Sequence, residues 1–311
     1  MRWLLTILAL LFALAGYVLL VYTPEQVKYS ERYPTTRTPA EVSLEYRDVV
    51  LNVTEDKLNL EAWFIPATTA PRAAVLFIHG GSSNRHSDFF DAMGFYKALA
   101  ERGYSVLTLD LRNHGNSDSD GEGMSFGVRE SRDALTALAW LESQLPETPL
   151  FMMGISMGGA TAIHAVARGA SPDGLILLDP LLDTDSVFTL GIWTQLDMNP
   201  ALFLPAAWSA RTFFGFPSGD NEAKAIAETL ELPTLLMQDP GDPVTLALHA
   251  RDVAANNPAI TYWEAPAIDT SDPGMAWRGR WGSHVAAFAV HPEQTLATIE
   301  RFTAEVMAGS R

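Results

Sequence analysis

Residues 150–159 read LFMMGISMGG, and this stretch decides the fold. Residues 150–155 form a short apolar run, which is typical of a strand buried on both faces of a sheet. The residues after Ser156 have the pattern of a helix that closes on Gly169. The segment GISMG (154–158) therefore matches G-x-S-x-G between a strand and a helix, the context in which this motif carries a nucleophile.

The two outer glycines of this motif have a steric purpose. A sharp strand-to-helix turn projects the serine hydroxyl away from the sheet, and Gly154 and Gly158 allow the close strand–helix approach. The first amides of the next helix would face developing negative charge. We therefore interpret Ser156 as a nucleophile rather than an incidental serine in a glycine-rich turn. A serine hydroxyl needs a base, usually a histidine held by a carboxylate.

Short apolar runs alternate with longer helical stretches on both sides of this motif. Further strands are predicted at AAVLFIHG (73–80), SVLTLDL (105–111), LILLDP (175–180), PTLLMQDPGD (233–242) and ITYWEA (260–265). Two earlier segments, 43–53 and 58–66, alternate with a period near two and are predicted as antiparallel strands at the edge. The pattern predicts an α/β domain with a mostly parallel central sheet of about eight strands and helices on both faces.

Composition and charge exclude several classes of protein. The 311 residues are 48% hydrophobic and 19% charged, which indicates a globular chain rather than a disordered one. The formal net charge of −16 argues against nucleic acid and anionic headgroups as partners, because both need a cationic surface. The sequence has no cysteine, which excludes disulfides, thiolate metal sites and a cysteine nucleophile.

Residues 1–23 are predicted to form a single-pass transmembrane anchor. Residues 4–22 carry no charge, and a helix rising about 1.5 Å per residue would cross about 30 Å of hydrocarbon. Trp3 and Tyr22 bracket the run, as interfacial aromatics do. A cleaved signal peptide is the alternative, although its apolar core is usually shorter and no A-x-A-like site follows. Arg2 precedes the run, which favours an extracytoplasmic domain.

Two segments lie outside the alternating pattern. Residues 24–43 are polar and rich in Pro and Thr, so they are predicted as a linker to a domain spanning 44–311. Residues 181–221 contain many Phe and Trp side chains and lie between a strand ending near Asp179 and the approach to the next strand. We predict a cap or lid insertion there, above the carboxyl ends of the strands, where α/β sheets bind ligands.

The base is expected after the acid in the chain, and three histidines satisfy that order. We favour His284, which ends a long loop and precedes the apolar run VAAFAV (285–290). His249 lies inside a helical pattern. His291 precedes Pro292 at the start of the final helix, where a capping or surface role fits better.

The acid is expected on the loop after the strand at 233–238. That loop holds both Asp239 and Asp242. We favour Asp242 because Pro243 stiffens its position, whereas Asp239 can cap the strand or sit in the turn. The choice between the two stays open at this stage.

The tetrahedral oxyanion needs two backbone donors. The strand at 73–78 ends in His79-Gly80-Gly81, and the N–H groups of Gly81 and Met157 are the predicted pair. His79 is interpreted as a packed histidine that bonds loop backbone. The segment LDLRNHGNSD (109–118) is interpreted as a structural turn rather than a metal site, and no metal is expected.

The motifs together resemble the α/β-hydrolase superfamily, and more narrowly the single-pass, membrane-anchored serine hydrolases of the dipeptidyl-peptidase-like group. The matching segments, in order, are LEAWFIP, VLFIHGG, LDLRNHGNSD, GISMGG, LLMQDPGDPV and GSHVAAF. The resemblance implies the α/β-hydrolase fold, a triad of Ser156, Asp242 and His284, and oxyanion donors at Gly81 and Met157. Where such proteins often have a His-Gly pair, this chain has Gln238-Asp239.

The sequence thus predicts a serine hydrolase that cleaves carboxylic esters through an acyl-enzyme, without metal or organic cofactor. The expected substrate is a small ester or acyl compound, apolar because of the aromatic insertion. A serine peptidase or amidase would use the same triad, and a lysophospholipase-like lipase would suit the anchor. A non-catalytic, membrane-tethered binding protein is the alternative from another class, since fold alone does not establish activity.

Overall fold

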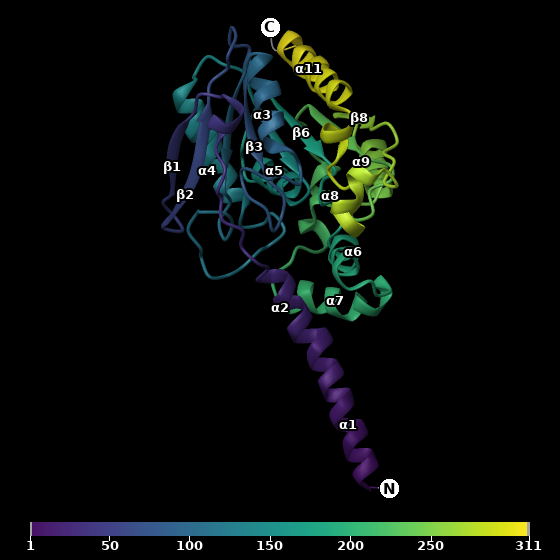
Figure 1. Cartoon of the computed structure of the whole chain (residues 1–311). Coiled ribbons are helices and arrows are strands. Elements are labelled where there is room, and N and C mark those ends of the chain that lie inside the picture. The colour runs from purple at the N-terminus through teal and green to yellow at the C-terminus, as the bar shows by residue number, and fades with distance from the viewer. Residues whose placement is uncertain (1, 310–311) are drawn as a thin grey trace.

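An eight-stranded sheet forms the centre of the computed structural model, which describes residues 2–309 (Figure 1). The strands are β1 (Arg47–Val53), β2 (Leu58–Ile65), β3 (Ala73–Ile78), β4 (Tyr104–Leu109), β5 (Leu150–Ile155), β6 (Gly174–Leu178), β7 (Thr234–Gln238) and β8 (Ile260–Glu264). Their spatial order is β1-β2-β4-β3-β5-β6-β7-β8. Strand β2 is antiparallel to both neighbours and the other adjacent pairs are parallel. The prediction of a mostly parallel sheet with an antiparallel edge is confirmed.

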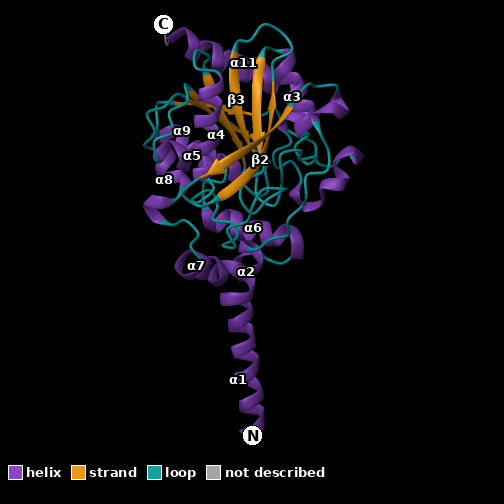
Figure 2. Cartoon of the chain, turned by 90° about the vertical axis from the view of Figure 1, so that its left-hand side faces the viewer, coloured by secondary structure: helices purple, strands orange, loops and turns teal. Residues whose placement is uncertain are grey.

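Helices cover both faces of this sheet, as predicted (Figure 2). They are α3 (Ala92–Glu101), α4 (Ser131–Gln144), α5 (Met157–Ala167), α8 (Ala223–Ala227), α9 (Ala247–Asn256), α10 (Ala287–Val290) and α11 (Pro292–Gly309). Helices α4, α5, α8 and α9 contribute to one apolar cluster, while α3, α10 and α11 contribute to the other. Every residue of β3, β4 and β5 is buried, because both of their faces are covered.

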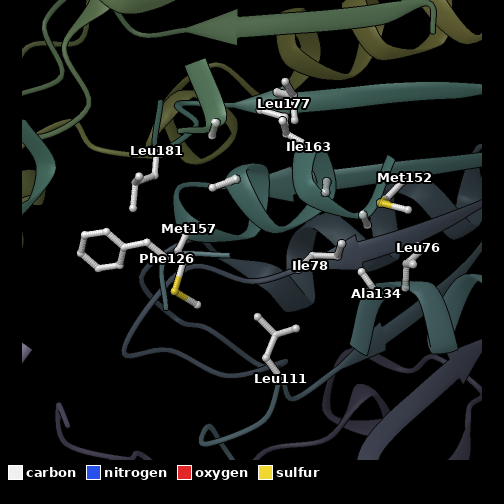
Figure 3. Packing of buried hydrophobic residues seen from close by; sticks show 14 of the residues in the cluster. Leu76, Ile78, Leu111, Phe126, Ala134, Met152, Met157, Ile163, Leu177 and Leu181 are labelled. Carbon is white, nitrogen blue, oxygen red and sulfur yellow. The ribbon is translucent and has the colours of Figure 1, made fainter. Parts of the chain in front are cut away.

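Alternate side chains of one strand enter the two clusters. Leu76 and Ile78 of β3 pack with α4 and α5, whereas Val75 and Phe77 pack with α3. Figure 3 shows part of the first cluster, including Leu76, Ile78 and Met157. This period-two packing fixes the register of β3, and a slip of one residue would exchange the two faces.

The N-terminal helix projects away from the domain, and the C-terminal helix α11 lies at the opposite end of the molecule (Figure 1). The N-terminal helix consists of α1 (Arg2–Tyr17), a π-helical turn η1 (Val18–Tyr22) and α2 (Thr23–Lys28). Residues Arg2–Lys28 are long and apolar enough to cross a membrane, and no residue of their most apolar stretch is buried, although Leu19 packs against the domain. Length and composition alone would also suit a signal sequence.

The segment predicted as a linker lies against the domain instead of standing free as a stalk. The Met124 N–H donates to Lys28 O at 2.7 Å, and the Thr35 hydroxyl donates to the Asp110 carboxylate at 2.9 Å. A short helical turn, η2 (Pro39–Val42), follows before β1 begins. Hydrogen bonds to a distant loop are a tertiary feature, which a polar Pro/Thr composition does not reveal.

The region 181–221 contains helices α6 (Thr184–Leu196) and α7 (Leu204–Phe213), with short turns η3 (Pro200–Phe203) and η4 (Gly219–Asn221). These elements lie between β6 and α8 in the chain, and α7 lies beside the end of the N-terminal helix (Figures 1 and 2). Some of the aromatic side chains turn inward, with the Phe188 and Phe126 rings both packed edge-on against Phe216. The last connection, η5 (Pro273–Trp281), belongs to the long loop before α10.

Candidate active site

Ser156 sits on a strained turn between β5 and α5. Its φ of 50° and ψ of −121° are rare for a residue with a side chain. A Cβ on Gly154 would lie 2.2 Å from Gly158 O, and a Cβ on Gly158 would lie 2.2 Å from Ile78 O. Only glycine permits this packing of helix α5 against the strands, which is the steric reason for the motif.

A hydrogen-bonded chain links the three residues that the sequence predicted as a triad. His284 Nε2 lies 3.0 Å from Ser156 Oγ, and His284 Nδ1 lies 2.7 Å from Asp242 Oδ2. The histidine and the aspartate are buried, and the serine is half-buried. Each distance is within hydrogen-bonding range, so the arrangement can pass a proton from the serine to the imidazole.

The geometry distinguishes the two candidate acids. Besides His284, the Asp242 carboxylate accepts hydrogen bonds from Val244 N–H at 2.7 Å, Thr245 N–H at 2.9 Å and the Thr245 hydroxyl at 2.6 Å. These bonds orient the Asp242 carboxylate so that its Oδ2 points toward the imidazole of His284. Asp239 accepts instead from Gly241 N–H at 3.0 Å, and burial raises the pKa of its carboxyl group.

Asp179, which the sequence reasoning did not assign to the site, ties the acid loop to the histidine loop. It follows β6, and its carboxylate accepts from Asp239 N–H at 2.7 Å and from Val285 N–H at 2.9 Å. Burial, and then the neighbouring Asp242 carboxylate, raise the pKa of Asp179 well above its usual value. One sequence signal could have indicated Asp179. It directly follows the buried strand β6, just as the candidate Asp239 directly follows the buried strand β7.

Arg278 is a second residue that the sequence did not reveal. Its guanidinium is buried and donates to the carbonyl oxygens of His284, Gly282 and Phe89, the last two at 2.7 Å and 2.6 Å. It also lies over the Phe89 ring, 3.7 Å from the centroid. Burial lowers the pKa of Arg278 to about 10. This cation holds the backbone of the histidine loop, and nothing in the local sequence pattern indicates it.

The predicted oxyanion donors lie close together. A Cβ built on Gly81 would be 3.4 Å from Met157 Sδ and 3.7 Å from Met157 Cβ. Met157 is the first residue of α5, where a backbone N–H has no partner within the helix. The hydrogen bonds of the described loops do not include one from Gly81 N–H. Within the described residues, neither N–H group is therefore taken up by a hydrogen bond.

The remaining histidines make other contacts. The His79 ring bonds backbone at both nitrogens, with Gly80 O at 2.7 Å and Leu111 N–H at 3.0 Å, and burial lowers its pKa to about 3. His249 lies 3.2 Å from the Ser186 hydroxyl, and His291 lies 3.4 Å from Ala267 O. Neither of these two is hydrogen-bonded to Ser156.

Two clusters could suggest a metal. Asp179, Asp242 and His284 offer ligand atoms within 4.8 Å of one another, but these atoms serve the hydrogen bonds described above. In the turn at 109–118, the Asp110 carboxylate pairs with the Arg85 guanidinium at 2.6 Å and accepts from Asn116 N–H at 2.8 Å. Asp110 is therefore bound within the turn.

Comparisons with known proteins place this architecture. The serine aminopeptidase S33 family matches residues 69–213. The lysophosphatidylserine lipase ABHD12 of Danio rerio is 32% identical over 122 residues, which cover 38% of this chain and 30% of that protein. The monoglyceride lipase of Rattus norvegicus is 30% identical over 166 residues, covering 52% of this chain and 53% of the lipase. An esterase of Pyrococcus furiosus superposes with a TM-score of 0.70 at 22% identity, covering 88% of this chain and 96% of the esterase.

The sheet order, the strained serine turn and these similarities define the α/β-hydrolase fold. The chain is a member of the α/β-hydrolase superfamily, as the sequence motifs implied. It spans less than a third of the length of the lysophosphatidylserine lipases that it matches. The similarity therefore covers the fold, and the proposed activity rests on the geometry of the site.

Proposed function

We propose that this chain is a membrane-anchored serine hydrolase that cleaves carboxylic esters. The observation that carries the proposal is the chain of hydrogen bonds from Ser156 Oγ through His284 to Asp242, at 3.0 Å and 2.7 Å. A nucleophile, a base and an orienting acid in this order are what acyl transfer to water requires. The similarity to lipases and an esterase supports the same class of reaction.

In the proposed mechanism, Ser156 Oγ attacks the ester carbonyl while His284 Nε2 accepts its proton. Asp242 orients the imidazole and stabilises its charged form. The Gly81 and Met157 N–H groups donate to the oxyanion of the tetrahedral intermediate. Collapse releases the alcohol, which takes the proton from His284, and leaves an acyl-enzyme. Water, deprotonated by His284, then releases the carboxylic acid and restores the serine.

The proposed substrate is an ester with an apolar acyl group. The inward-facing rings of Phe126, Phe188 and Phe216 supply an apolar surface in the cluster that also contains Met157. The proposed location is a membrane, with a single N-terminal span and an extracytoplasmic domain. A lysophospholipase-like activity fits both features, and the curated relatives named as lipases support it.

A serine peptidase or amidase is the second candidate. The match to the serine aminopeptidase S33 family favours it, and the triad would be unchanged. An ester panel of increasing acyl length, assayed beside a panel of peptide amides, separates the two activities. Faster turnover of the amides would contradict the ester proposal.

The decisive experiment combines a fluorophosphonate probe with hydrolysis of a short p-nitrophenyl ester. The full chain is expected to label and to turn over, whereas Ser156→Ala and His284→Ala lose both properties. His291→Ala is the matched control, because it removes a histidine from the same part of the chain without touching the serine. A wild-type rate in Ser156→Ala, or no labelling of the wild-type chain, would overturn the proposal in favour of another nucleophile or a binding role.

A further inference from the structure

The outer surface of the cap is apolar in a strongly acidic protein. Between residues 198 and 219 the only charged residue is Arg211, and its guanidinium is paired with Asp185 at 2.8 Å. Five large apolar side chains there are about half exposed or more. We call them the apolar cap face: Met198, Leu202, Leu204, Trp208 and Phe213, which are 45–69% exposed. A cap bathed in water on this side would be expected to carry charges.

This face lies at a defined level along the N-terminal helix. The Ser209 hydroxyl of α7 donates to Leu20 O at 2.5 Å, and α7 lies beside the end of the N-terminal helix in both views (Figures 1 and 2). Leu20 belongs to the last turn of the apolar run 4–22. A helix that embeds this run in a bilayer therefore brings α7 to the boundary between hydrocarbon and headgroups.

The connection between helix and domain is short and fixed. The helix is continuous to Lys28, whose carbonyl accepts from Met124 N–H at 2.7 Å. Ser30, two residues after Lys28, accepts a hydrogen bond at its Oγ from the Ser82 hydroxyl at 2.8 Å. The domain thus has little freedom to rotate away from the membrane and withdraw the cap from its surface.

We propose that the apolar cap face inserts into the headgroup region of a zwitterionic bilayer beside the anchor. This proposal depends on the proposed function, in which the N-terminal helix is kept as a membrane anchor. A bilayer is the occupant that fits because it also covers the exposed apolar side chains of α1 and of η1, the turn that contacts α7. Trp208 suits an interface, where tryptophan is enriched. The net charge of −16 disfavours an anionic surface, so zwitterionic lipid is the matching chemistry.

The test uses the lack of cysteine in the chain, which makes a single introduced thiol unique. Trp208→Cys in the full chain is labelled with an environment-sensitive NBD dye and placed in phosphatidylcholine nanodiscs. Leu248→Cys on α9 is the matched control, since Leu248 is 51% exposed and Trp208 is 50% exposed. A shallow nitroxide lipid is expected to quench the dye at 208 at least about twofold more than at 248, with a blue-shifted emission at 208.

Equal quenching at both positions would overturn the proposal. Protection of 208 from aqueous iodide without lipid quenching, rising with protein density in the disc, would also overturn it and indicate a second copy as the occupant. The readout needs no catalysis, so it separates this proposal from the failure of the triad assignment.

A second arm connects the surface to turnover. Trp208→Glu is expected to slow hydrolysis of a long-chain monoacyl ester in the disc by about fivefold or more, because a carboxylate resists the interface. Hydrolysis of a short water-soluble ester should stay within about twofold, since Trp208 has no hydrogen bond to the triad. Equal loss with both substrates would contradict a role in membrane contact.

Discussion

The Asp179 carboxylate accepts a hydrogen bond from the N–H of Val285, the residue after the proposed base, at 2.9 Å. Both residues have left-handed backbone angles, with φ values of 44° and 50°. A β-branched residue rarely adopts this conformation, so the surrounding structure must hold it there. The end of strand β6 thereby sets the position of the histidine loop.

Asp179→Ala is expected to lower kcat by about 10- to 100-fold with KM changed less than about twofold, because the histidine loses its support and not its chemistry. Asp179→Asn should recover part of the loss, since its single amide oxygen can accept one of the two N–H groups. Steady-state kinetics on a soluble ester measure this. An unchanged kcat in the alanine variant would show that Asp179 does not position the base.

Asp242→Asn and Asp239→Asn should differ sharply. The amide at 242 no longer stabilises the charged imidazole, and a fall in kcat of about 10³- to 10⁴-fold is expected. The amide at 239 can still accept from Gly241 N–H and should cost less than about tenfold. Comparing kcat of the two variants at one pH decides between them. The reverse ranking would make Asp239 the acid.

Gly158→Ala should destabilise the domain by about 3 kcal/mol or prevent folding, because the new methyl would lie 2.2 Å from Ile78 O. Gly191→Ala in helix α6 is the control: nothing lies within 4 Å of its Cβ, and a gain of about 0.5 kcal/mol is expected. Thermal unfolding in detergent reports both changes. A Gly158→Ala variant as stable as the wild type would mean that α5 can shift away from β3.

Because of His164 on α5, the folded domain is expected to lose stability in acid. Its ring is buried, Nε2 has no hydrogen-bond partner, and burial and then Arg168 lower its pKa to about 4. The unfolded state therefore binds a proton near pH 6.5 while the folded state does not, and folding free energy is lost as the pH falls through this window. At pH 5 the loss from this one residue is about 2 kcal/mol.

His164→Leu removes that proton uptake. The difference in unfolding free energy between variant and wild type should move in favour of the variant by about 2 kcal/mol between pH 7.5 and pH 5. Unfolding midpoints at the two pH values measure it. A difference that does not change with pH would mean that His164 is protonated to the same extent in both states.

The parts of the structure that local sequence encodes were predictable. Ser156 was proposed as the nucleophile because a buried strand, two glycines and a helix are contiguous in sequence, and the structure confirms that strand and helix. These strands were recognisable because a strand that is buried on both faces has an uninterrupted run of apolar residues, as in β3 and β5. The expected chain order of serine, acid and histidine then restricted the candidate acid and the candidate base to short segments after Ser156.

The features that escaped prediction depend on contacts between distant segments. Composition gave residues 24–43 as a linker, but hydrogen bonds join Thr35 to Asp110 and the Ser30 hydroxyl to Met124 Sδ, 75 and 94 positions further along the chain. Arg278 could not be distinguished from a solvated arginine, because its partners are backbone carbonyls that carry no sequence signature. Sequence alone could not show which of the two aspartates on one loop is hydrogen-bonded to His284, because that depends on the direction in which each carboxylate points.

The fixed attachment of residues 28–35 also bears on the kinetics of the proposed enzyme. A catalytic centre held at constant height above a bilayer searches for its substrate in two dimensions, and the substrate's abundance in that layer sets the encounter rate. Turnover of a membrane-resident ester should therefore scale with its mole fraction among the lipids and not with its amount per volume of solution. Diluting the membranes with buffer would leave the rate per enzyme unchanged, whereas diluting the ester with inert lipid would lower it.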